Sequence, residues 1–209
     1  MKNCMLLLAS LIVCSLYNNI SRAQTQLSLL NGKQYNLNNF SLNESQKYIE
    51  FTYFNKSGKI KKNYADFTDI WSININGVDS IFYRQLEPEE YSFDEMRNLV
   101  LARQFAVKEY HPWWALPTGF IIGCVPMFMP LDPFSKILIP IAYVGAMNFV
   151  KPSKSYILHR YDFAAGDELF YYGYRDTARK KIFARSTAGV VGGVFLAGIV
   201  VGTLSLIDK

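Results

Sequence analysis

The sequence predicts an α+β protein, in which a small antiparallel β barrel or roll is followed by an amphipathic helix and about three transmembrane helices. Two observations support this fold class. Residues 24–83 contain short runs of aromatic and β-branched residues, separated by turn signals and without helical period. Further along, uncharged runs occupy 113–131, 137–150 and 186–207, and the last is long enough to cross a bilayer.

The first 23 residues have the layout of a secretory signal peptide. Lys2 precedes an apolar core at 5–16, and a polar stretch ends in the small-x-small cleavage site at 21–23. The apolar core is short for a bilayer span, which favours cleavage over anchoring. Lipidation at Cys14 ranks second, because the preceding Val13 is bulkier than lipoprotein signals usually carry.

Composition argues against several classes of function. Loss of Lys2 and Arg22 with the signal leaves 20 basic residues against 17 acidic ones, and a net charge of +3 is too mild for nucleic-acid binding. Cys124 is then the last cysteine, so no intramolecular disulfide is expected. His111 and His159 each lack a neighbouring ligand for a metal. No nucleophile or phosphate-loop motif is present and the soluble part is small, so we expect no enzyme and no cofactor.

The β module at 24–83 is divided by turn signals. Asn-Gly dipeptides at 31–32 and 76–77 each predict a two-residue type I′ hairpin, because this turn needs two positive φ values. A Ser-Gly pair at 57–58 predicts a third turn. Five or six short strands arranged in this way favour a compact barrel or rolled sheet.

A helix is expected within 84–111. Ser92 and Glu95 form the capping-box pattern, in which the serine hydroxyl and the glutamate carboxylate each accept from the other's backbone amide. Apolar residues recur after it at helical spacing, and His111-Pro112 marks the end.

The segment 112–150 is expected to form a membrane hairpin. Pro117, Pro126 and Pro130 should kink its first leg, and Asp132-Pro133 makes the turn. The return leg, through Pro140, is short. The hairpin either crosses the bilayer twice or re-enters on the same side, and we favour crossing. Export of the chain places 151–185 on the outer side, although the positive-inside rule favours the cytoplasm for so basic a segment.

Residues 151–185 form a basic, tyrosine-rich interfacial segment. A helix is expected to begin near Asp167 and to continue without a break into the C-terminal transmembrane helix at 186–209. Basic residues before the span and tryptophans at the hairpin mouth are expected to contact lipid headgroups. These residues are Arg179, Lys180, Lys181, Arg185, Trp113 and Trp114.

Glycines spaced four apart predict close helix packing in the membrane, because they let two backbones approach each other. On the C-terminal span they fall on two neighbouring faces, and the first run of the hairpin carries a pair that can form the other half of the contact. The helix-packing candidates are Gly119, Gly123, Gly189, Gly193, Gly198 and Gly202.

The order of these segments resembles a known group of proteins. A signal ending in Ala-Gln precedes Leu-x-Leu-x-Asn-Gly-Lys at 27–33 and Asp-Ile-Trp-Ser-Ile at 69–73. Tyr-Tyr-Gly-Tyr at 171–174 and Ala-Arg-Lys-Lys at 178–181 precede the glycine-rich span. This order is similar to that of Bacteroidota cell-envelope membrane proteins with no established activity. The resemblance covers nearly the whole mature chain and implies an envelope location.

Two functions are consistent with this organisation. The first is a non-enzymatic, membrane-anchored accessory or structural subunit of an envelope complex, for example in secretion or outer-membrane biogenesis. Its partners would be the lipid bilayer and envelope proteins, or further copies of the chain through the C-terminal helix. The alternative is a membrane-tethered periplasmic module that binds or senses a peptide, glycan or lipid. A channel ranks third, because the spans hold no ionisable residue away from their ends.

Overall fold

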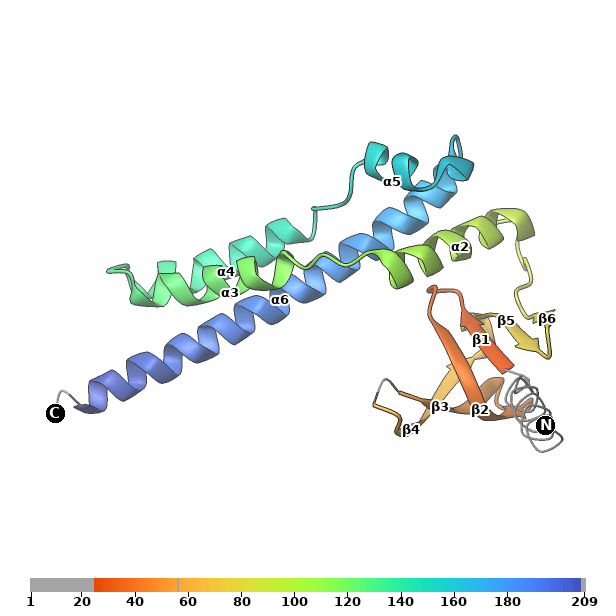
Figure 1. Cartoon of the computed structure of the whole chain (residues 1–209), viewed down its shortest axis with the longest axis horizontal. Helices are drawn as coiled ribbons and strands as arrows, with labels where there is room; N and C mark the ends of the chain where they lie inside the picture. Colours follow the sequence, from red (N-terminus) through yellow and green to blue (C-terminus); the bar gives the residue numbers. More distant parts are fainter. Residues whose placement is uncertain (1–24, 56, 208–209) are drawn as a thin grey trace, which may run out of the picture. The chain divides into compact units, whose positions relative to one another are not determined.

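The computed structural model describes residues 25–55 and 57–207, and within them the chain is α+β (Figure 1). The signal peptide expected at 1–23 lies outside the described residues. The chain divides into two compact units, of which the first contains the β-sheet and ends at Arg84. The second comprises residues 31–33 and the chain from Gln85 onward, and it contains the helices.

The first unit is a single six-stranded antiparallel sheet in the order β4-β3-β2-β1-β5-β6. The sheet is open, so the expected barrel closure is wrong. Closure would need pairing between the edge strands, but β6 has only four residues, all exposed, and β4 carries exposed lysines, which blunt an edge. The strands are β1 (Thr25–Leu29), β2 (Gln34–Asn43), β3 (Tyr48–Phe54), β4 (Ile60–Asp66), β5 (Ile70–Ile75) and β6 (Val78–Ile81).

One of the two expected type I′ hairpins is present. Asn76 and Gly77 have φ values of 56° and 87°, as this turn requires, and they join β5 to β6. The prediction for the first pair is wrong, because Gly32 has a positive φ and Asn31 does not. There the Asn31 side chain accepts a hydrogen bond from the Lys33 amide at 3.0 Å. This Asx turn lengthens the connection between β1 and β2.

The sheet has a hydrophobic core of its own, in which Leu27, Ile49, Phe51, Ile70 and Ile73 are each at most 2% exposed. These residues come from β1, β3 and β5. The core therefore joins strands that lie apart in the sequence but belong to the same unit.

We expect residues 24–83 to fold without the rest of the chain. Trp71 is 9% exposed and its ring centroid lies 5.9 Å from that of Tyr83, so the isolated module should give fixed aromatic signals in near-UV circular dichroism. Ile49→Asp should abolish these signals, while Val78→Asp, at a side chain 68% exposed, should preserve them. A featureless spectrum from the unsubstituted module would contradict an autonomous domain.

The second unit contains five helices within the described residues. Its first helix starts at the expected capping box, which is confirmed: the Ser92 hydroxyl accepts from the Glu95 amide at 3.4 Å, and the Glu95 carboxylate accepts from the Ser92 amide at 2.8 Å. The helices are α2 (Phe93–Glu109), α3 (Ala115–Phe128), α4 (Pro133–Met147), α5 (Lys154–Arg160) and α6 (Glu168–Ile207).

Only α6 is long and apolar enough to cross a membrane within the described part of the chain, so the expectation of three spans is wrong. Its start next to Asp167 is confirmed. Helices α3 and α4 have 14 and 15 residues, or about 21 to 23 Å at 1.5 Å per residue, against a hydrocarbon core of about 30 Å. Their lengths favour a re-entrant hairpin over one that crosses twice. The Asp132 carboxylate caps α4 and Pro133 occupies its first turn, which prevents a longer helix here.

Helices α2 and α3 follow one another along α6 and run parallel to it, and α4 returns alongside (Figure 1). Helix α2, helix α5, the 3-10 turn η2 (Asp162–Ala164) and the first turns of α6 share one buried cluster. Because they form one body, the regions around 93–109 and 154–178 lie on the same side of any membrane that α6 crosses.

Candidate functional site

The closest helix contact joins α3 to α6 through glycines. A Cβ atom at Gly193 would lie 2.9 Å from the Cys124 amide nitrogen and would overlap the Phe120 carbonyl, so only glycine fits. The same holds at Gly119, Gly123 and Gly189. The pairs are Gly119 with Ser186, Gly123 with Val190, Gly189 with Leu116, and Gly193 with Phe120.

The structure separates the six glycine candidates into two groups. Gly119, Gly123, Gly189 and Gly193 lie together at the α3–α6 contact. A Cβ atom at Gly198 or Gly202 would meet no atom within 4 Å. The second glycine face therefore takes no part in this contact.

The outer sides of α3, α4 and α6 are strongly apolar. Ile121, Phe134, Ile141, Val191 and Phe195 are each more than half exposed. Water-soluble surfaces rarely carry contiguous apolar patches of this kind, and such patches indicate a lipid or protein environment.

The expected lipid-headgroup residues have different environments. Trp113 is largely exposed, while Trp114 and Arg185 are half-buried. Arg179 and Lys180 both pair with the Asp176 carboxylate, at 2.8 and 2.7 Å.

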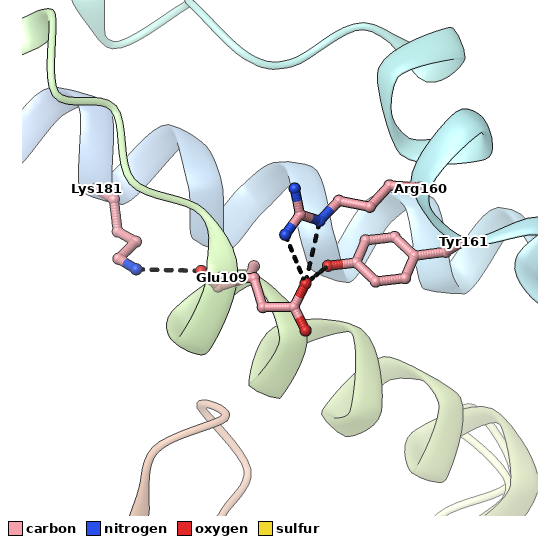
Figure 2. Close-up of polar contacts among 5 residues, drawn as sticks. Glu109, Arg160, Tyr161 and Lys181 are labelled. Carbon is pink, nitrogen blue, oxygen red and sulfur yellow. Dashed lines mark hydrogen bonds and ion pairs between the residues drawn. The ribbon is translucent and has the colours of Figure 1, made fainter.

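Lys181 has a role that the sequence did not indicate. Its ammonium group donates to the carbonyl oxygens of Ala106, Val107 and Tyr110 at 3.1, 2.6 and 2.7 Å. Figure 2 shows one of these three contacts. The last carbonyls of a helix lack partners within it and are favourable sites for a cation. Lys181 of α6 therefore caps the C-terminus of α2, a geometry that favours helix capping over the headgroup contact expected for it.

A polar cluster next to this cap joins α2 to α5. One carboxylate oxygen of Glu109 accepts from Arg160 Nε at 3.0 Å and from the Tyr161 hydroxyl at 2.8 Å (Figure 2). The Tyr161 ring is 5% exposed and lies 4.9 Å from the Phe105 ring and 5.6 Å from the Tyr174 ring, centroid to centroid. The cluster thus connects a surface ion pair to the aromatic core.

The hydrogen bond from the Tyr161 hydroxyl lowers the pKa of Glu109, and Arg160 lowers it further by a smaller amount. Burial of the carboxyl group opposes both effects without cancelling them. Burial raises the pKa of Tyr161, and the neighbouring Glu109 carboxylate adds to this. At neutral pH the pair is therefore a phenol that donates to an ionised carboxylate.

We expect the helical unit to lose stability in acid through Glu109. Because the folded-state pKa of this carboxyl lies below its ordinary value of about 4.3, its contribution is complete above that value and is lost as pH falls through the folded-state pKa. The difference in Tm between the unsubstituted protein and Glu109→Gln, followed by helical circular dichroism, should be constant down to about pH 5 and shrink below about pH 4. Tyr161→Phe should reduce this difference. Equal differences at pH 3 and pH 7 would contradict it.

Within the described residues no group of three or more His, Cys, Asp or Glu side chains is placed to hold a metal ion. Comparison of the chain with known proteins identifies no family: no protein-family model, no curated protein and no solved structure matches it.

Proposed function

We propose that the protein is a membrane-anchored, non-enzymatic structural subunit of a bacterial cell-envelope complex, as its resemblance to Bacteroidota envelope proteins implies. The observation that carries this proposal is the continuity of α6. This helix runs for 40 residues without a break, with an extramembrane core packed on its first half and α3 packed on its second half.

Such continuity couples the two halves of the helical unit mechanically. A simple tether needs only an apolar span and a flexible linker. Here Lys181 and the Glu109 cluster hold α2 and α5 on α6, immediately before the apolar half begins. This arrangement supports a scaffold that presents a docking surface at a defined height above the bilayer.

The apolar exterior supports the second part of the proposal. Lipid covers these side chains in a monomer, and helices of partner proteins or of further copies cover them in a complex. The outer face of α6 carries Val191, Phe195 and Gly198, a mixture of large and small residues suited to helix packing.

Co-purification after mild detergent extraction tests the proposal. Stoichiometric partner proteins are expected with the unsubstituted chain. Lys181→Met should reduce their recovery while the protein stays in the membrane, because it loosens the extramembrane body and leaves the span unchanged. Lys180→Met, one residue earlier and exposed, is the matched control. Recovery of a monomer or simple homo-oligomer alone would contradict a subunit role.

That contrary result would favour the alternative, a membrane-tethered module whose β domain binds a peptide, glycan or lipid. The open sheet is the observation in its favour. Its edge strand β6 pairs with β5 alone among the described strands, and an unpaired edge can add a strand from an extended peptide.

The shared helical core predicts on which side of the membrane each segment lies. We expect a reporter active only outside the cytoplasm to give signal when fused after Tyr83 and after Asp162, and, in the inner membrane, no signal after Lys209. Deletion of residues 1–23 should abolish the first two signals. Signal after Tyr83 with silence after Asp162 would contradict a hairpin that returns to its starting side.

A further inference from the structure

A small polar pocket lies at the N-terminal end of α6, against the segment that follows α4. Its volume is about 290 Å³, smaller than a typical drug-sized site. Five of its lining side chains are Lys151, Glu168, Tyr171, Arg175 and Arg179.

The pocket has an excess of positive charge. Its two carboxylates are already paired, Glu168 with Lys154 at 2.6 Å and Asp176 with Arg179 and Lys180. Arg175 and Lys151 belong to none of the ion pairs found in the described part of the chain. The positive charge of Arg175 is also close enough to repel the ammonium group of Lys154.

Two buried hydrogen-bond donors on residues that line the pocket have no partner in the described structure. Tyr171 is 3% exposed and its hydroxyl has no partner, and the buried Nε of Arg175 has none either. A guanidinium group does not lose its charge, and a buried donor without an acceptor costs about 1 to 3 kcal/mol. An anion bound beside these residues would bring acceptor oxygens to the Arg175 guanidinium.

We propose that this pocket binds a phosphate group, held by Arg175 and Lys151 with the Tyr171 hydroxyl as a further donor. A phosphate offers several acceptor oxygens to donors that converge from different directions, and arginine recognises it with two parallel hydrogen bonds. The inference is independent of the proposed subunit role, because it rests on the pocket alone.

The phosphate can come from a lipid headgroup or from a soluble compound. Lys151 directly follows the apolar run that ends at Val150, so its long side chain can hold a phosphate at the level of the headgroup layer. Glycerol 3-phosphate and phosphatidic acid distinguish the two sources, because they share a phosphomonoester and differ in the acyl chains.

The experiment measures binding of both probes to the full chain in a neutral detergent, by calorimetry for glycerol 3-phosphate and by native mass spectrometry for phosphatidic acid. Arg175→Gln should weaken binding about tenfold, as expected for one charge-assisted contact. Lys151→Gln, at an exposed position that cannot disturb the core, should act in the same direction. Arg97→Gln is the matched control, an exposed arginine on α2 outside the pocket.

Binding of phosphatidic acid alone would assign the site to a lipid headgroup, and binding of both probes would assign it to phosphomonoesters in general. Either result supports the proposal if Arg175→Gln and Lys151→Gln weaken binding and Arg97→Gln does not. Absence of binding by both probes would overturn it. Equal losses in all three variants would also overturn it, because they indicate diffuse attraction to a basic surface.

Discussion

Gly193→Leu is expected to force α3 away from α6 and to lower the free energy of unfolding in detergent by about 3 kcal/mol. The introduced side chain would overlap the main chain of α3 at Phe120 and Cys124, and backbone cannot move aside as a flexible side chain can. Membrane insertion should be unaffected, because leucine is more favourable than glycine in a span.

The matched control is Gly198→Leu, on the same helix. Nothing lies within 4 Å of a Cβ atom there, so this variant should be as stable as the unsubstituted protein or slightly more stable.

Disulfide crosslinking in membranes gives a direct readout of the α3–α6 contact. The pairing of Leu116 with Gly189 and of Phe120 with Gly193 places Cys124 next to Ala197 in the following turn. With Cys4 and Cys14 replaced by serine, Ala197→Cys should crosslink to Cys124, and adding Gly193→Leu should reduce the yield strongly. An undiminished yield would show that this glycine face is not a packing face.

Features that depend on neighbouring residues were predictable from the sequence. The Ser92–Glu95 capping box and the start of α6 next to Asp167 involve residues at most three or four apart. The type I′ turn at 76–77 is equally local. The same dipeptide at 31–32 adopts another turn, because a hydrogen bond from the Lys33 backbone amide to the Asn31 side chain competes with the backbone preference.

Features that depend on distant residues were not predictable. Barrel closure depends on whether β4 meets β6, which local patterning does not determine. The turn at Asp132-Pro133 was expected, but hydropathy does not show that the helix of the first leg is only 14 residues long. The contacts of Glu109 with Arg160 and Tyr161 join residues 51 and 52 positions apart.

Lys181 shows how similar residues acquire different roles. In the sequence it is one of four basic residues before the span, and all four fit a headgroup function. Only the fold places its ammonium group at the end of α2, while its neighbour Lys180 pairs with Asp176 on the surface.

Lys181→Met should therefore lower the free energy of unfolding by about 2 to 3 kcal/mol, because it keeps the apolar stem and leaves three carbonyl oxygens of α2 without their shared charged donor. Lys180→Met removes an exposed lysine while Asp176 keeps Arg179 as its partner, so it should cost at most about 1 kcal/mol. Amide hydrogen exchange localises the effect: protection should fall in the last two turns of α2 and at the following Trp113–Trp114 segment, and should be unchanged around Gly193. If both variants lose the same stability, or if the loss of protection is spread evenly over the helical unit, Lys181 does not act as the cap that joins α2 to α6.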